Sequence, residues 1–199
     1  GARHLGAKIL VSGGARCNVT NRVVTERDFW GGPTRFVRHV LRAFTAAHAV
    51  TFFEELGVSL HEEEDGKLFP DTNRARTVLD ALLSAADAAG VTIDAQQRVC
   101  DLRRDRDGFT IHTHDRRYTA QRVVMATGGR SLPKSGSDGV GYELAARLGH
   151  GVVETTPALA PLLLGDAWHA ALAGVAHDVS LALRVDGRVT MRMDGALLW

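Results

Sequence analysis

Apolar residues recur at helical spacing in four stretches of the chain. In 33–44 and again in 49–57 they follow the i, i+3, i+4 pattern of a helix face. An alanine-rich run over 73–89 extends the pattern, and a shorter run covers 140–148. Glycines suited to helix C-termini close the last three stretches: Gly57, Gly90 and Gly149. The pattern predicts four helices, the first two in direct succession.

Polar and apolar residues alternate through much of the remaining sequence, which predicts strands. Residues 58–70 alternate around Asp65-Gly66, a dipeptide suited to a tight hairpin because both positions tolerate positive φ. Three runs joined by short polar turns predict a β-meander over 98–129. Shorter predictions are a strand or extended loop at 8–11, a strand at 91–94, a strand leading into a Pro-limited loop at 152–164, and β structure over 178–199.

Composition narrows the class of protein. The chain is 45% hydrophobic and 24% charged, and no apolar run approaches the roughly 18 to 20 residues needed to span a bilayer. A formal charge of +1 indicates no global field for nucleic acid or an anionic membrane, so we expect neither as a partner. Cys17 and Cys100 lack paired spacing and no secretory signal precedes them, which favours a reducing cytoplasm.

Two glycine-rich motifs carry the candidate chemistry. SGGARCN, residues 12–18, places Gly13 and Gly14 where backbone can approach a ligand, followed by the cation Arg16 and by Asn18. Such a loop can wrap a flavin or a phosphate, and a plain turn is the alternative. It is neither G-x-G-x-x-G nor a phosphate-binding loop.

The second motif, ATGGRS at 126–131, follows an apolar run predicted to be the last strand of the meander. Thr127, Gly128 and Gly129 would then lie at the carboxyl end of a strand, where open α/β sheets bind ligands. A strand-terminating turn is the alternative.

The order of these motifs resembles that of a known family. SGGxRCNVTN, FFEELGV, GKLFP, a helix and meander, ATGGxSxPKSGSxGxGYxLAxxLGH and PALxPL occur in the order typical of bacterial NAD(P)/FAD-dependent, aminoacetone-oxidase-like oxidoreductases with a glutathione-reductase-like FAD fold. The resemblance covers residues 6–199 and implies an α/β fold, α+β within these residues. A partial Rossmann-like FAD domain with the β-meander would occupy 1–155, and a mostly β substrate domain would start at 156–199.

The resemblance also implies roles for single residues. Near the isoalloxazine it places Gly13, Gly14, Arg16, Cys17 and Asn18. Farther along the cofactor it places Val99 by the adenine, and Thr127, Gly128 and Gly129 by the ribityl or pyrophosphate part. The turn with Gly139 and Gly141 would open a helix whose N-terminal amides could bind flavin or an anionic substrate. FAD is the expected cofactor, NAD(P)H a plausible electron donor and a small organic molecule the substrate.

The sequence departs from the family pattern at two positions and lacks one of the family's segments. Ala15 stands where the family has a third glycine, and Val140 where many relatives carry an acidic residue, so we assign no polar contact to the 136–142 turn. The family's opening strand, G-x-G-x-x-G turn and helix do not occur, and the apolar end at Trp199 interrupts a predicted strand. We therefore expect an internal fragment that binds FAD poorly alone, from a parent that binds it.

Arg16 is the strongest candidate for a catalytic charge, because a guanidinium beside the flavin would stabilise its anionic reduced form. A structural salt bridge is its alternative role. Cys17 lacks a Cys-x-x-Cys partner and is expected to pack as a small hydrophobe. Glu62–Glu64 suggest a solvated hairpin. No metal site is expected, because the spacing of His61, His112, His114 and His177 matches no metal signature.

The predicted function is that of an FAD-dependent oxidoreductase, with amine oxidation and reduction of an activated double bond both open. A non-catalytic remnant or interaction module without its nucleotide-binding unit is the alternative. An RNA-modifying flavoprotein is disfavoured, since the sequence shows no basic patch interleaved with aromatic residues. The oligomeric state is not predicted.

Overall fold

A computed structural model describes residues 4–131, 133–157, 163–165 and 168–199. The chain divides into two compact units, Gly1–Glu154 and Thr155–Trp199. This division falls one residue before the predicted boundary at 155. The assignment of the units to an FAD domain and a substrate domain stays a prediction.

The first unit begins with a short helix, α1 (Ala7–Val11), where a strand or extended loop was predicted. Hydrogen bonds from the amide of Leu10 to the carbonyl of Gly6 (3.0 Å) and from Ser12 to Lys8 (3.1 Å) define it. The helix turns Ile9 and Leu10 against the buried side chains of the core. The strand prediction was wrong because an apolar run of four residues does not distinguish a short helix from a strand.

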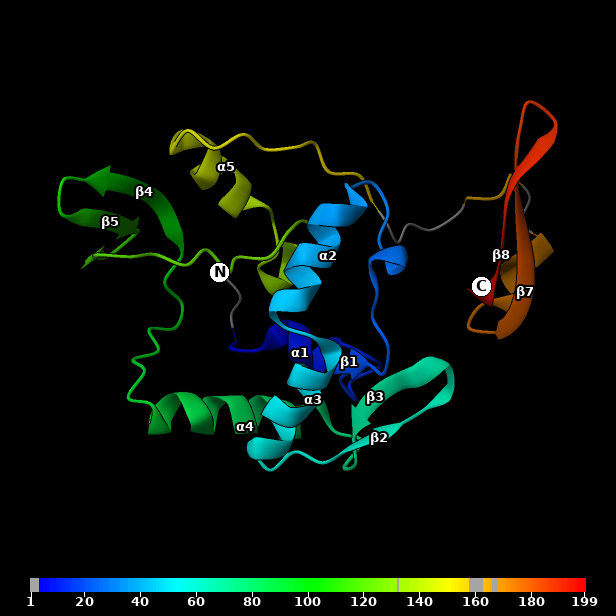
Figure 1. Cartoon of the computed structure of the whole chain (residues 1–199), viewed down its shortest axis with the longest axis horizontal. Coiled ribbons are helices and arrows are strands. Elements are labelled where there is room, and N and C mark those ends of the chain that lie inside the picture. Colours follow the sequence, from blue (N-terminus) through cyan, green and yellow to red (C-terminus); the bar gives the residue numbers. More distant parts are fainter. Residues whose placement is uncertain (1–3, 132, 158–162, 166–167) are drawn as a thin grey trace. The chain divides into compact units, whose positions relative to one another are not determined.

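The four predicted helices are confirmed (Figure 1). They are α2 (Thr34–Ala43), α3 (Ala46–Glu55), α4 (Ala75–Ala88) and α5 (Val140–Arg147), and 3-10 turns form at Glu26–Asp28 (η1) and Pro133–Ser135 (η3). Thr45 separates α2 from α3 and caps α3 by accepting a hydrogen bond from the His48 amide at 3.2 Å. Gly90, at φ +70°, ends α4 as predicted.

The predicted hairpin at 58–70 is also confirmed. It consists of β2 (Leu60–Glu62), a 3-10 turn η2 (Glu64–Gly66) and β3 (Lys67–Pro70), and β1 (Thr20–Asn21) pairs with the outer edge of β3. The order β1-β3-β2 is antiparallel throughout. Next to this sheet the core gathers Cys17, Val58, Ala75 and Val78, which come from the loop after α1, the start of the hairpin segment and α4.

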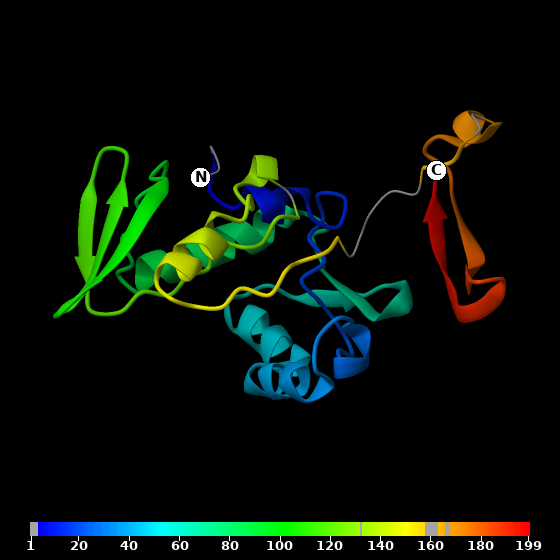
Figure 2. The ribbon, with the colours of Figure 1, turned by 90° about the horizontal axis from the view of Figure 1, so that it is seen from above.

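The meander forms a separate antiparallel sheet, β4-β5-β6, visible in Figure 2. Its strands are β4 (Val99–Asp105), β5 (Gly108–Thr113) and β6 (Arg117–Ala120). The third strand is much shorter than predicted, because its ladder with β5 ends at the pair Phe109–Ala120, where β5 turns back into β4. Residues 121–129 and 91–94 therefore run as irregular segments, and among the described residues no strand pairs with either.

The second unit contains a 3-10 segment η4 (Trp168–Leu172) and one long hairpin. The hairpin pairs β7 (Ala176–Val185) with β8 (Arg188–Leu198) and confirms β structure in the tail. Residues 152–157 form no strand, contrary to the prediction, and 158–162 lie outside the described residues. In the part of the chain that the structure describes, no helix is both long and apolar enough to cross a membrane.

Candidate functional site

A pocket of about 630 Å³ in the first unit collects part of the predicted cofactor site. Val99, Thr127 and Gly128 all line it, together with the first residues of α1, the approach to β4 and the start of α5. Lys8 of α1 donates a hydrogen bond to the Ser131 hydroxyl, which ties the helix to the ATGGRS segment. Residues distant in sequence thus form one concave surface.

Glycines in the ATGGRS segment and in the 136–142 turn allow these two segments to pack together. A Cβ on Gly141 would collide with the Thr127 side chain, and one on Gly128 would lie 2.9 Å from the Ser137 hydroxyl. A Cβ on Gly129 would lie 2.9 Å from the Tyr142 hydroxyl, and one on Gly139 would lie 2.6 Å from Nε of Arg130. Gly128 and Gly139 also adopt positive φ and the collision at Gly141 is severe, so these three positions need glycine for residues 127–130 to pack against the start of α5. This reason is independent of any ligand.

An ion pair reinforces the same junction. Arg98 lies 2.7 Å from Oδ2 of Asp138, and Oδ1 of Asp138 accepts a hydrogen bond from the Val140 amide at the start of α5 (3.3 Å). The Arg98 hydrogen bond and then the Val140 amide hold the pKa of Asp138 below its ordinary value. The 136–142 turn thus fastens α5 to the residue before β4.

The SGGARCN loop follows the other end of α1. Gly13, Gly14 and Ala15 adopt left-handed conformations in succession, with φ of 54°, 66° and 67°. The amide of Cys17 closes the turn onto the carbonyl of Ser12 at 3.0 Å, and the amide of Ala75 in α4 donates to Ala15 at 3.0 Å. The loop is therefore a fixed turn anchored to α4.

Gly13 and Gly14 have different surroundings. A Cβ on Gly13 would lie 2.7 Å from the Asn18 amide nitrogen and 2.8 Å from the Phe69 ring, so this glycine serves packing within the loop. Around Gly14 no atom lies within 4 Å of the corresponding position. The backbone hydrogen bonds of the described residues leave the amides of Gly14 and Ala15 without a partner. Gly14 therefore presents open backbone to whatever binds beside the loop.

Arg16 is held by two groups of the β2–β3 hairpin. Its guanidinium forms an ion pair with Glu63 and lies 4.3 Å above the centre of the Phe69 ring. The Arg16 hydrogen bond is the main cause that lowers the pKa of Glu63. Glu63 also lies 3.5 Å from Nε2 of His61. The salt bridge given above as the alternative role of Arg16 is present, and the cation keeps an exposed side.

Glu63 is the residue that sequence reasoning missed. The run Glu62–Glu64 suggested a solvated hairpin, and nothing local distinguishes its middle carboxylate. The pairing of β2 with β3 places Glu63 and Phe69 beside the same arginine. The contact between Arg16 and Glu63 therefore depends on how β2 pairs with β3, which a local sequence pattern does not give.

Cys17 and Asn18 serve the loop itself. Cys17 is buried with Val58, Ala75 and Val78, and both cysteines are free thiols. The side-chain amide of Asn18 lies 3.3 Å from Oδ1 of Asn21 at β1. The thiol acts in packing, as the sequence suggested for an isolated cysteine. Among the described residues no group of three His, Cys, Asp or Glu side chains is placed to hold a metal ion.

The two regions fit the two parts of an elongated cofactor. Gly6, Ala7 and Lys8 line the pocket, whereas the loop begins at Ser12, four to six residues or about 6–9 Å farther along the helix at 1.5 Å per residue. A flavin dinucleotide is long enough to bridge that span. The open backbone at Gly14 supports this fit.

Comparison with known proteins supports the same class. Residues 1–183 match the model of the HI0933-like protein Rossmann domain. The chain is 32% identical over 194 residues to a 3-dehydro-bile acid delta(4,6)-reductase of Clostridium scindens, which covers 98% of this chain and 47% of that protein.

Two further relatives carry a different name. A ribosomal RNA dihydrouridine synthase of Escherichia coli is 32% identical over 159 residues, covering 80% of this chain and 40% of that protein. The corresponding protein of Haemophilus influenzae is 29% identical over 185 residues, covering 90% and 46%. The chain thus spans less than half the length of each of these relatives. With a family match over residues 1–183, the chain belongs to the HI0933-like protein Rossmann domain family of FAD-binding oxidoreductases.

Proposed function

We propose that the protein reduces a carbon–carbon double bond of an organic substrate, with NAD(P)H as the source of electrons. The names of the three relatives support this direction over amine oxidation, because one is a reductase and two form dihydrouridine. When bound, FAD would supply the two-electron chemistry. The substrate gains two electrons and two protons, and NAD(P)H is oxidised to NAD(P)⁺.

The observation that carries the proposal is the fixed position of Arg16. The ion pair with Glu63 and the Phe69 ring hold the guanidinium beside the open backbone of Gly14. A cation that is already oriented stabilises developing negative charge without having to reorganise. Arg16 would therefore favour the reduced, anionic form of a ring system bound at this loop.

The pocket would hold the other part of the cofactor. Val99 would offer backbone polar groups to an adenine, and Thr127 and Gly128 would contact the connecting chain of the dinucleotide. Gly139 and Gly141 act indirectly in this proposal, by allowing α5 to pack against Thr127 and Arg130.

The test is anaerobic reduction of the protein expressed from its complete gene. We expect NADH or NADPH to bleach the flavin absorbance, and Arg16→Gln to slow this reduction about tenfold, the equivalent of removing one charge-assisted interaction. Arg22→Gln is the matched control, because Arg22 neighbours the same hairpin through Glu62 at 3.7 Å. Amine-driven reduction without reaction with NAD(P)H would reverse the proposed direction.

The alternative of a non-catalytic interaction module makes a different prediction. Such a protein, purified from the complete gene, would contain no flavin and would take up none when FAD is added. Two substrate classes remain within the reductase proposal: a small molecule, as the sequence suggested, or a uridine in RNA. The surface of α2 favours the second.

A further inference from the structure

One segment of the first unit differs in composition from the rest of the chain. Residues 29–53 contain three arginines, two histidines and no Asp or Glu, whereas the whole chain has 24 basic and 23 acidic residues. The same 25 residues hold six of the chain's twelve aromatic side chains. A net charge near zero conceals this local excess, and our interpretation that the sequence has no basic patch interleaved with aromatic residues overlooked it.

Helix α2 arranges these residues in two adjacent stripes. Arg35, Arg38, His39 and Arg42 recur at i, i+3, i+4 and i+7, which places them within an arc of about 100°. Phe36 and Val40 form an apolar stripe beside them. No residue of α2 is buried, so both stripes are accessible within the described part of the chain.

The aromatic side chains around the basic stripe are unusually exposed. Trp30 is 71%, Phe36 65% and Phe44 57% accessible to solvent. Large aromatic side chains are more often buried, and a cluster that is not marks an interaction site. Exposed planar rings beside arginines are the combination on which unpaired bases stack.

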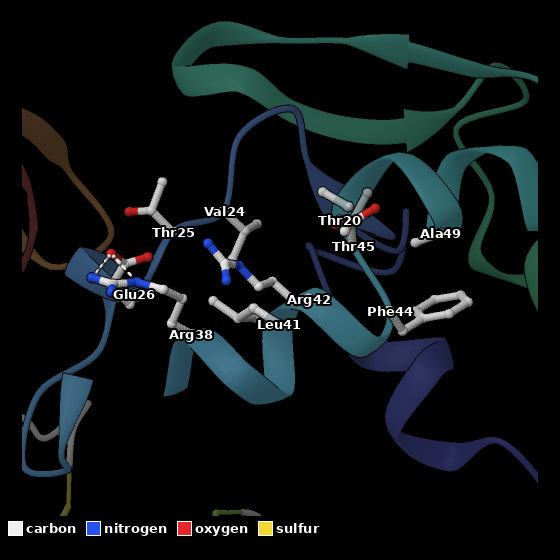
Figure 3. Close-up of a pocket in the computed structure, with 11 residues that line it drawn as sticks. Thr20, Val24, Thr25, Glu26, Arg38, Leu41, Arg42, Phe44, Thr45 and Ala49 are labelled. Atoms are coloured by element: carbon white, nitrogen blue, oxygen red, sulfur yellow. Dashed lines mark hydrogen bonds and ion pairs between the residues drawn. The ribbon is translucent and has the colours of Figure 1, made fainter. Parts of the chain in front are cut away.

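The arginines differ in whether they are already paired. Arg38 binds Glu26 through Nε at 2.9 Å and Nη2 at 2.6 Å. Among the described residues no ion pair involves Arg35 or Arg42. Figure 3 shows the Arg42 guanidinium extending beside Val24 in a pocket of about 410 Å³, between α2 and the start of α3. Two cations are thus available, one of them at a concave, partly apolar site.

We propose that this surface, which we call the α2 face (Trp30, Arg35, Phe36, Arg42 and Phe44), binds single-stranded RNA. Arg35 and Arg42 would contact phosphates, for which the planar guanidinium is suited, and the rings would stack with bases. The inference rests on the proposed function for its biological purpose, since it makes a uridine in RNA the substrate. RNA binding itself can be measured without flavin chemistry.

A membrane surface is the competing partner for a basic amphipathic helix. The α2 face fits it less well, because its exposed apolar stripe is narrow and Leu41 points into the pocket beside Arg42 instead of outward (Figure 3). The Arg42 residue is exposed and lines this pocket, where its guanidinium can donate hydrogen bonds to a phosphate. We therefore commit to RNA.

The experiment measures binding of the 199-residue chain to a fluorescent single-stranded 12-nucleotide U-rich RNA by anisotropy, over a series of salt concentrations. Arg35→Gln/Arg42→Gln should weaken binding about tenfold and reduce the log–log salt slope by about 1.4, because each phosphate that is no longer neutralised accounts for about 0.7. Trp30→Ala/Phe36→Ala should weaken binding at least fivefold and leave the salt slope unchanged.

The matched control is Arg104→Gln/Arg106→Gln, which removes the same charge from the exposed end of the β4–β5 hairpin. It should retain binding and the salt slope. If both arginine pairs weaken binding equally, or if the chain binds phosphatidylserine vesicles but not the RNA, the α2 face is not an RNA surface. Normal reduction by NAD(P)H without RNA binding would overturn this inference alone, and RNA binding by a protein that takes up no flavin would overturn the reductase proposal alone.

Discussion

Ala15 adopts a conformation that its side chain disfavours. Its φ of 67° lies in the left-handed region, directly after two glycines that adopt it without cost, and Cys17, two residues later, adopts it as well. The Ala15 carbonyl accepts the hydrogen bond from Ala75 that anchors the loop to α4. The family's glycine at this position therefore has a conformational reason, which the structure makes visible.

Ala15→Gly should stabilise the chain. Relief of the left-handed strain, about 1–2 kcal/mol, exceeds the extra conformational entropy that glycine gives the unfolded state, about 0.4–1 kcal/mol. We expect a net gain of about 0.5–1 kcal/mol in urea unfolding. Ala146→Gly, in helix α5, is the control and should have the opposite sign. A loss of stability in Ala15→Gly would contradict this account.

Glu63 should give the chain a pH-dependent contribution to stability. Its pKa is lowered from the ordinary 4.5, chiefly by the hydrogen bond from Arg16, so the folded state favours the ionised carboxylate. The stabilisation is present above that ordinary value and is lost as the pH falls through the lower pKa of the folded state. Glu63→Gln should therefore be less stable than wild type at neutral pH, and the difference should vanish in acid.

Urea unfolding of both proteins across this pH range is the measurement. Glu64→Gln provides the control, because Glu64 is an exposed carboxylate of the same hairpin without an ion pair among the described residues. It should match wild type at neutral pH. A Glu63→Gln difference that is constant with pH would show that the carboxylate charge is not what matters.

At the scale of elements, two neighbouring glycines of the SGGARCN loop have different surroundings: Gly13 is packed within the loop, whereas Gly14 faces open space. Gly13→Ala should cost about 2–4 kcal/mol, because a left-handed alanine there also collides with Asn18 and Phe69. Gly14→Ala faces open space and should cost about 1 kcal/mol. In the protein from the complete gene, Gly14→Ala should nevertheless lower FAD retention, measured by absorbance after gel filtration. Retention equal to wild type would place the cofactor elsewhere.

The helices could be predicted from sequence and several strands could not, for a physical reason. A helix such as α4 has its hydrogen bonds and its closing Gly90 within one segment, so a local pattern contains the information. Residues 91–94 and 122–125 are apolar enough for strands but find no partner among the described strands. Glu63 escaped prediction for the same reason, since its partner Arg16 lies 47 residues earlier in the chain.

At the scale of the whole molecule, the two units differ in how much structure supports them. The first has two three-stranded sheets and four long helices, whereas the second, in its described part, has one two-stranded hairpin with mostly exposed side chains. Such a hairpin is marginally stable by itself. Local opening should therefore need far less free energy in β7–β8 than in α4.

Hydrogen exchange can measure this difference. In the 199-residue chain, amides of the β7–β8 ladder should exchange at least about a hundredfold faster than those of α4 around Val78 and Leu79, which are buried in the first unit. The β4–β5–β6 sheet, with a third strand, should lie between them. Equal protection of β7–β8 and α4 would contradict this ranking.

The hairpin that holds Arg16 has a consequence for how related proteins can diverge. The partners of this arginine are one carboxylate and one ring, both on residues 60–70 and remote in sequence from the SGGARCN motif. A single codon change at position 63 would alter the charge beside the arginine while every residue of the motif stayed the same. Under the proposed role of Arg16, members of the family with identical motifs would differ in redox behaviour, although a comparison of motifs alone would group them together.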